Sequence, residues 1–225
     1  MSEVFTPHLG ILPLAQRQLW PELKGALGLG FVLYGGTAIA LRLGHRQSVD
    51  FDFFCKAPLN HEAMHAAMPF LARATVLQDE KNAFSVLVPS TAPGSSYVKV
   101  SFFGTIEFGR VGEPNKTEDG VLLVASLDDL MATKVKVVLQ RAEAKDYRDI
   151  AHMVRSGVSL ARGLAAARAM FGPNFQPSES LKALVFFKDG DLNQLSKDEK
   201  DMLTTAVDAV RDLPSVAILA RELLG

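Results

Sequence analysis

The stretch between residues 31 and 54 constrains the fold of this chain more than any other part of the sequence. A short β-prone run leads into Gly35 and Gly36, a helical stretch follows, and an alternating run with Asp50 and Asp52 comes last. Successive side chains of a strand point to opposite faces, so the two carboxylates are expected on one face. The stretch therefore predicts a strand, a tight turn, a helix and a second strand that presents two acids.

This pattern suits a phosphorylated ligand. Adjacent glycines let backbone N–H groups approach a ligand closely, and the N-terminus of the following helix favours an anion. Thr37 can add a hydroxyl donor, and Arg46 can pair with a phosphate oxygen. Asp50 and Asp52 on one face suit a hard divalent cation such as Mg²⁺, which bridges phosphates.

Each part of the pattern also has an ordinary structural explanation. Two glycines form a common turn, two alternating aspartates can lie on a solvated edge strand, and Arg46 with Asp50 can be a surface ion pair. The conjunction is more specific, because the acidic pair follows Gly36 by 14 residues with a helix between. We therefore interpret the stretch as a candidate nucleotide and metal site.

The remaining chain predicts two domains. Residues 1–125 mix helical and strand patterns, whereas a capping box at Ser126 and Asp129 opens a mostly helical remainder. The fold class is therefore α+β for residues 1–125, followed by a helical domain over residues 126–225. Expected helices lie at 12–27, 37–43 and 61–71, expected strands at 31–34, 49–54, 74–78, 83–88 and 97–103, and a turn-rich connection at 89–96.

Composition excludes several classes of protein. The 225 residues carry a formal net charge of −1, which argues against histone-like coating of nucleic acid. No stretch reaches the roughly 20 apolar residues of a membrane span, and no Lys or Arg precedes Arg17 as a secretory signal would require. The single cysteine, Cys55, fits a reducing compartment and a core position. We expect a cytoplasmic protein without a membrane partner.

Gly35-Gly36-Thr37 followed by Asp50-x-Asp52 resembles the signature of the polymerase-β-like nucleotidyltransferases. The longer string GGTAIALRLGHRQSVDFDFF is similar to the AbiEii/MenT-type abortive-infection toxins. A weaker second window resembles the lysine and the later aspartate-containing helix motif of that group; it contains Lys134, Arg141, Lys145, Asp146 and Asp149.

The resemblance implies a two-lobed protein with a short mixed sheet. It also implies Mg²⁺-dependent attack of an acceptor hydroxyl on the α-phosphate of a nucleoside triphosphate, with release of pyrophosphate. Some relatives modify the 3′ end of tRNA, and many are paired with an antitoxin protein. The expected catalytic residues are Asp50, Asp52 and Lys134, with both aspartates as metal ligands; the expected nucleotide-binding residues are Gly35, Gly36, Thr37, Arg46, Ser48 and Asp146.

The helical window also has a structural interpretation. On a helix from about Leu127, Lys134 and Arg141 would share a face, and Asp146 would share a face with Asp149. Lys134 can neutralise a triphosphate, or these charges can form an ion-paired helix surface. Residues 134–168 carry eight basic and three acidic side chains, a local excess suited to a triphosphate or an RNA backbone.

One residue departs from the family pattern. The fold normally supplies a third carboxylate from a neighbouring strand, and Ser101 occupies the expected position. Serine is a poor metal ligand and a poor base near neutral pH. Asp79 and Glu80 are alternative acids, whereas Glu107 lies about 20 Å further along an extended chain.

Ser101 leaves three functions open. The chain can be an active nucleotidyltransferase, a catalytically weakened protein that binds nucleotides and acts through a partner, or an enzyme that modifies a small molecule.

Overall fold

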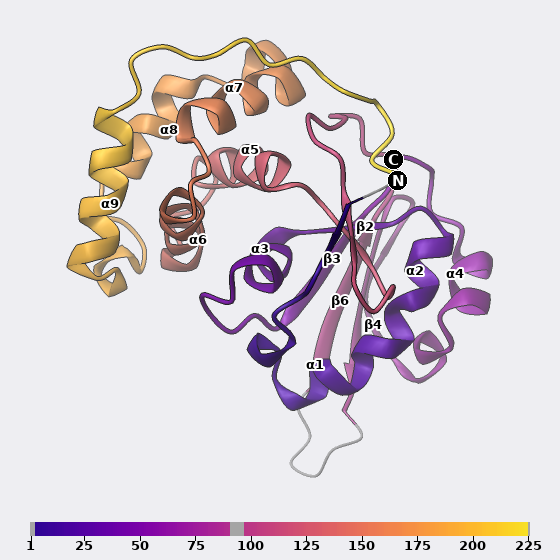
Figure 1. Cartoon of the computed structure of the whole chain (residues 1–225). Coiled ribbons are helices and arrows are strands. Elements are labelled where there is room, and N and C mark those ends of the chain that lie inside the picture. The colour runs from indigo at the N-terminus through magenta and orange to yellow at the C-terminus, as the bar shows by residue number, and fades with distance from the viewer. Residues whose placement is uncertain (1–2, 91–96, 225) are drawn as a thin grey trace. The chain divides into compact units, whose positions relative to one another are not determined.

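The computed structural model describes residues 3–90 and 97–224, and the chain divides into two compact units (Figure 1). The first unit contains Met1–Gly109, Glu113–Ala125 and Arg221–Gly225, and the second contains Arg110–Gly112 and Ser126–Ala220. Two short segments, Arg110–Gly112 and Arg221–Gly225, thus belong to the other unit than the predicted division at residue 125 implies. Most of the predicted connection at 89–96 lies outside the described residues.

An eight-stranded mixed sheet forms the centre of the first unit, in the order β1-β7-β8-β2-β3-β6-β5-β4. The strands are β1 Val4–Phe5, β2 Val32–Tyr34, β3 Asp50–Phe54, β4 Thr75–Glu80, β5 Ala83–Pro89, β6 Tyr97–Phe103, β7 Asn115–Thr117 and β8 Leu123–Val124. β3 is antiparallel to β2 and parallel to β6. The α+β class is as predicted, whereas β1, β7 and β8 are too short to leave a sequence pattern.

Alternation along β3 separates the two faces of the sheet. Phe51 and Phe53 are fully buried, and ring contacts join Trp20 to Phe51 and Phe53 to Phe102. The helices α1 Leu14–Leu19, α2 Gly25–Gly28 and α4 His61–Ala67 lie along one side of the sheet, and α3 Gly35–Leu43 lies on the other (Figure 1). Phe51 and Phe53 therefore belong to the core of this unit, on the face of the sheet opposite the two aspartates.

Two expected helices are interrupted. Pro21 follows the start of a 3₁₀ turn, Trp20–Lys24, which separates α1 from α2 in the predicted helix 12–27. Pro69 similarly opens a 3₁₀ turn, Pro69–Arg73, after α4. Val49 is half exposed and precedes β3, which begins at Asp50, one residue later than the predicted strand 49–54.

The second unit is helical. Its helices are α5 Leu127–Val137, α6 Ala144–Arg155, α7 Leu160–Phe171, α8 Pro177–Leu184 and α9 Lys197–Asp208. Ser126 caps α5 by accepting a hydrogen bond from the Asp129 N–H. The Asp129 carboxylate accepts from the Val111 and Gly112 N–H groups instead of completing the predicted capping box.

The end of the second unit differs from the helical prediction. After α9 the described chain continues without a helix until Ala220 forms a β-bridge with Arg110. The following segment, 221–224, belongs to the first unit, where Leu223 is buried.

Among the residues that the structure describes, no helix is both long enough and apolar enough to cross a membrane.

Candidate nucleotidyl transfer site

Two carboxylates share one face of β3. Asp50 and Asp52 are partly exposed, while Phe51 between them is buried on the opposite face. The Cα of Asp52 is in register with Tyr34 of β2 on one side and with Ser101 of β6 on the other. The predicted acidic pair is therefore in the middle of the sheet, at the strand beside α3.

Gly35 lies against the second carboxylate. Its φ angle is +74°, and a Cβ at this position would be 2.8 Å from Oδ2 of Asp52. Both the backbone conformation and the available space favour glycine here. α3 begins at this residue without a side-chain cap, so its first N–H groups suit an anion. Carboxylate oxygens beside such a helix start fit Mg²⁺ with a phosphate, because Mg²⁺ prefers oxygen ligands.

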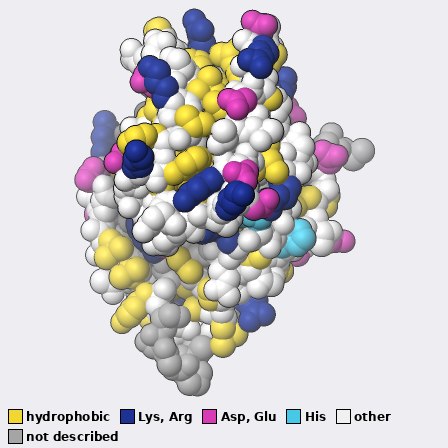
Figure 2. All heavy atoms as spheres, turned by 90° about the vertical axis from the view of Figure 1, so that its left-hand side faces the viewer, with side chains coloured by type: hydrophobic (Ala, Val, Ile, Leu, Met, Phe, Trp, Pro, Cys, Tyr) yellow, Lys and Arg dark blue, Asp and Glu magenta, His cyan; other side chains and the backbone are white. Residues whose placement is uncertain are grey.

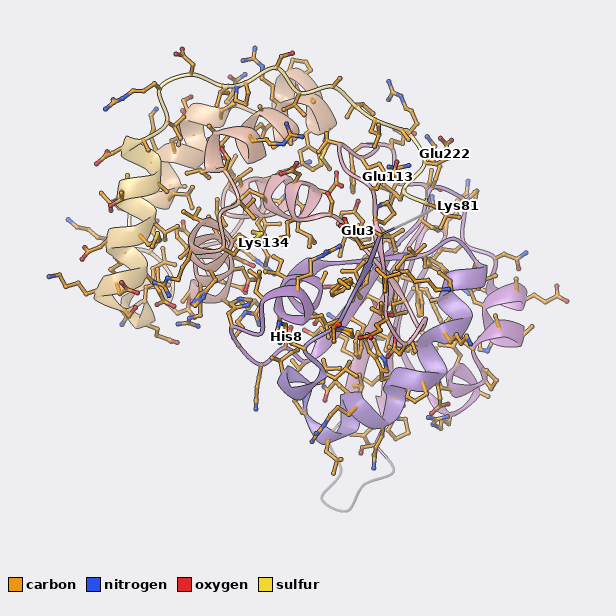
Figure 3. All side chains as sticks on the ribbon, in the orientation of Figure 1. Glu3, His8, Lys81, Glu113, Lys134 and Glu222 are labelled. Atoms are coloured by element: carbon orange, nitrogen blue, oxygen red, sulfur yellow. The ribbon has the colours of Figure 1, made fainter. Side chains whose placement is uncertain are left out.

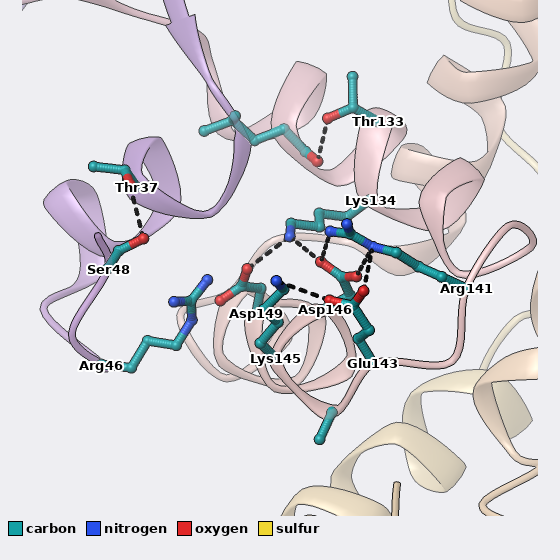
Figure 4. Close-up of polar contacts among 12 residues, drawn as sticks. Thr37, Arg46, Ser48, Thr133, Lys134, Arg141, Glu143, Lys145, Asp146 and Asp149 are labelled. Carbon is teal, nitrogen blue, oxygen red and sulfur yellow. Dashed lines mark hydrogen bonds and ion pairs between the residues drawn. The ribbon is translucent and has the colours of Figure 1, made fainter. Parts of the chain in front are cut away.

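Thr37 ties α3 to β3. Its buried hydroxyl donates to the main-chain carbonyl of Asp50 and lies 2.7 Å from Oγ of Ser48 (Figure 4). These contacts fix the start of β3 and hence the position of the first carboxylate. Arg46 donates to the main-chain carbonyl of Gln47 and makes further contacts. Direct phosphate contacts of Thr37, Ser48 and Arg46 stay predictions.

The strand beside β3 supplies no carboxylate to this face. Ser101 is paired with Asp52, is 1% exposed, and accepts a hydrogen bond of 3.1 Å from Oγ of Ser85 on β5. Lys99 is paired with Asp50 and is exposed. Lys99 and Ser85 were not among the predicted site residues, because their positions beside the aspartates follow only from the strand register.

The alternative acids do not fill the position of Ser101. Asp79 is in register with Phe84, which is in register with Phe102, so it belongs to the opposite face of the sheet. Glu80 is on the correct face, but three strand spacings, about 14 Å, separate β4 from β3. Glu107 is exposed and lies beyond the end of β6.

In the second unit, Lys134 is buried between two carboxylates (Figures 3 and 4). Its Nζ is 2.5 Å from Oδ1 of Asp146 and 2.8 Å from Oδ2 of Asp149, and both acids have fully buried side chains. Arg141 adds a hydrogen bond of 2.8 Å to Asp146. Burial raises the pKa of Asp146, but the charges of Lys134 and Arg141 outweigh burial and hold this pKa below its ordinary value.

The helical window differs from its prediction in one detail. α5 ends at Val137, so Arg141 lies beyond the helix and reaches Asp146 from the following loop. Lys145 pairs with Glu143 at 2.8 Å. The aspartates of α6 do share a face, as their common contact with Lys134 requires.

Carboxylates offset much of the basic excess in residues 134–168. Three arginines of this stretch pair with acids from elsewhere in the second unit, in the pairs Arg148–Glu199, Arg155–Asp198 and Arg162–Asp128. Figure 2 shows dark blue and magenta side chains interspersed on the face that it presents. The excess in sequence is therefore larger than the excess of unpaired charge.

Comparison with known proteins identifies the family. The sequence profile of the AbiEii family, described as nucleotidyl transferase toxins of type IV toxin–antitoxin systems, matches residues 22–221. The chain belongs to the AbiEii nucleotidyl transferase toxin family. An AbiEii match of this extent spans both units and contains every candidate site residue. It also supports nucleotidyl transfer as the general activity.

One protein is similar to this chain in sequence, and two solved structures agree with the family at the level of fold. An uncharacterized protein of Aquifex aeolicus is 29% identical over 161 residues, which cover 71% of this chain and 74% of that protein. A nucleotidyltransferase candidate from H. pylori has a similar structure, with a TM-score of 0.59, 19% identity and coverage of 86% of this chain and 92% of that chain. MenT4, a nucleotidyltransferase toxin of Mycobacterium tuberculosis, has a TM-score of 0.50, 14% identity and coverage of 85% and 91%.

Proposed function

We propose that this AbiEii-family chain transfers a nucleoside monophosphate from a nucleoside triphosphate to an acceptor hydroxyl group, with Mg²⁺ bound by Asp50 and Asp52. The close approach of Gly35 to Asp52, at the uncapped start of α3, supports this function most directly. The acceptor oxygen bonds to the α-phosphorus and releases its proton to solvent water. The bond from that phosphorus to the β-phosphate oxygen breaks, and pyrophosphate leaves.

The chain's own residues bind and orient the nucleotide in this proposal. The backbone at Gly35 and Gly36 receives phosphate oxygens, because α3 begins there and the first N–H groups of a helix have no carbonyl partner within the helix. Thr37 holds Asp50 in place through a hydrogen bond to the Asp50 carbonyl, Ser48 contacts the Thr37 hydroxyl, and Arg46 adds positive charge. When bound, Mg²⁺ supplies Lewis-acid polarisation of the phosphate oxygens.

Substitution of each carboxylate tests the site. Asp50→Asn and Asp52→Asn keep side-chain size but remove the charge, so transfer of label from an α-labelled nucleoside triphosphate should fall by at least about 100-fold. Asp79→Asn is the matched control, because this aspartate lies on the opposite face of the same sheet. Full transfer by a folded Asp52→Asn protein would refute the proposed metal site.

For the acceptor, we propose the 3′ end of tRNA, and for the partner a cognate antitoxin. The type IV toxin–antitoxin description of the family supports an antitoxin partner, whereas the choice of tRNA follows from the resemblance of the sequence to relatives that modify the 3′ end of tRNA. Each of the four α-labelled nucleotides is incubated with total tRNA, and with tRNA whose 3′ diol has been oxidised by periodate. Label on intact tRNA alone supports the proposal, whereas equal label on both preparations excludes the 3′ hydroxyl groups.

A second candidate function is nucleotide binding without efficient transfer. The buried hydrogen bond between Ser85 and Ser101, in place of a carboxylate beside Asp52, favours this alternative. Mg²⁺-dependent nucleotide binding by calorimetry, without label on RNA, protein or small-molecule acceptors, would support it over the first.

A further inference from the structure

The face of the sheet around Asp50 and Asp52 carries less negative charge than its two aspartates suggest. The neighbouring strand β6 places Lys99 beside Asp50 and Ser101 beside Asp52, in parallel register. Paired residues of neighbouring strands point to the same face and lie about 4.8 Å apart. The two aspartates therefore have a cation and a neutral hydroxyl as their neighbours on β6.

Neither neighbour is arranged to act as an anionic ligand. Ser101 is 1% exposed and accepts a hydrogen bond from Ser85, which is itself buried. Among the described residues, Lys99 lies within ion-pair distance of no carboxylate, so its charge is not offset by another acid. Residues 3–90 and 97–224, which the structure describes, contain no group of three or more His, Cys, Asp or Glu side chains that could hold a metal ion.

A divalent cation needs more oxygen ligands and more negative charge than this face of the sheet supplies. Mg²⁺ takes six ligands in octahedral geometry and is usually held through one or two carboxylates together with substrate phosphates. Two carboxylates next to a lysine give a site whose net charge is about −1, so a cation without nucleotide is weakly retained. The phosphates of a nucleotide would add both oxygen ligands and negative charge.

We propose that Lys99 and Ser101 make divalent cation binding at Asp50 and Asp52 depend on the phosphates of the nucleotide, so that the ion and the triphosphate bind as one unit. This inference rests on the proposed function. It assigns Lys99 to the triphosphate side of the site and Ser101 to the exclusion of a third acidic ligand. Coupling of this kind is reciprocal, so Mn²⁺ and nucleotide each raise the affinity of the other by the same factor.

Calorimetry with the full chain tests the coupling without any turnover. Mn²⁺ is titrated alone and with each of the four α,β-methylene nucleoside triphosphates, at constant ionic strength. For the unmodified protein, the affinity for Mn²⁺ should rise at least about tenfold with the nucleotide that binds. Equal affinity for Mn²⁺ with and without a bound nucleotide would overturn the inference.

Two variants make the site around Asp50 and Asp52 more negative, one by adding a carboxylate and the other by removing a lysine. Ser101→Asp adds a carboxylate and should strengthen binding of Mn²⁺ alone by about tenfold, with Ser101→Asn as the uncharged control of equal size. Lys99→Gln should strengthen it by about threefold or more, and because Lys99 is exposed this variant keeps the fold. Lys81→Gln, in the turn after β4, is the control for loss of an exposed lysine.

The outcomes separate this inference from the proposed function. If Mn²⁺ alone binds Lys99→Gln and folded Ser101→Asp no better than their controls, the inference is wrong while nucleotide transfer can still stand. If none of the four nucleotides binds at any Mn²⁺ concentration, the proposed function fails and the inference fails with it.

Discussion

The Cβ position of Gly35 lies 2.8 Å from Oδ2 of Asp52, whereas the Cβ position of Gly30 has nothing within 4 Å. Both glycines have a left-handed φ angle, +74° and +77°. The two residues therefore form a matched pair in which backbone strain is the same and only the contact with the carboxylate differs.

Gly35→Ala should reduce nucleotide transfer far more than Gly30→Ala does. Each substitution costs about 1–2 kcal/mol of stability, because alanine is strained at positive φ. Only Gly35→Ala must also displace the Asp52 carboxylate. Urea denaturation measures the loss of stability that both variants share. Transfer from an α-labelled nucleotide measures the loss of activity that displacement of Asp52 causes. Equal activity of the two variants would show that the position of Asp52 does not matter.

Lys134→Met should cost about 3–5 kcal/mol in the free energy of unfolding at pH 7. The substitution leaves the buried carboxylates of Asp146 and Asp149 without their shared cation. Lys136→Met is the control, since its Nζ lies over the Phe171 ring and not in a buried ion pair. A stable Lys134→Met protein that has lost transfer would instead favour a direct role of this lysine on phosphate.

The protein should lose stability in acid in part through Asp146. The folded-state pKa of this carboxyl lies below its ordinary value, so its contribution is complete above the unfolded pKa of about 3.9 and is lost as the pH falls through the lower folded value. Asp146→Asn should be less stable at pH 7 and should lose less on acidification. Urea midpoints from pH 7 to pH 2 measure both effects, and parallel curves for the two proteins would contradict this assignment.

Cys55 should resist alkylation in the folded protein. Its side chain is buried, and burial raises the pKa of the thiol to about 11, so almost no thiolate exists at pH 8. Iodoacetamide should label the cysteine only at urea concentrations that unfold the first unit. Equally fast labelling with and without urea would show that the position opens readily.

The sequence was sufficient to predict the acidic strand and the glycine turn, because alternation and turn chemistry are local. The short strands β1, β7 and β8 could not be predicted, since two or three residues form strands only through their partners. The positions of Lys99 and Ser85 beside the candidate site follow from the register of β6 with β3 and β5. Register depends on long-range pairing, which leaves no trace in spacing along the chain.

Charge counting along the sequence had a similar limit. The excess of basic residues between 134 and 168 is real, but Glu199, Asp198 and Asp128 lie outside that window and pair with its arginines. Likewise, helical spacing placed Lys134 and Arg141 on one helix, whereas α5 ends before Arg141. Both differences arise from tertiary contacts that bring distant residues together.

Leu223 is 1% exposed and belongs to the first unit, although the sequence of the whole helical unit precedes it. During translation, a ribosome therefore synthesises residues 126–220 before this leucine becomes available to the first unit. Burial of one leucine contributes roughly 1.5–3 kcal/mol. Nascent chains that already contain both aspartates and the complete sheet are thus less stable than the finished protein, and the candidate site reaches its full stability only after the helices have left the ribosome.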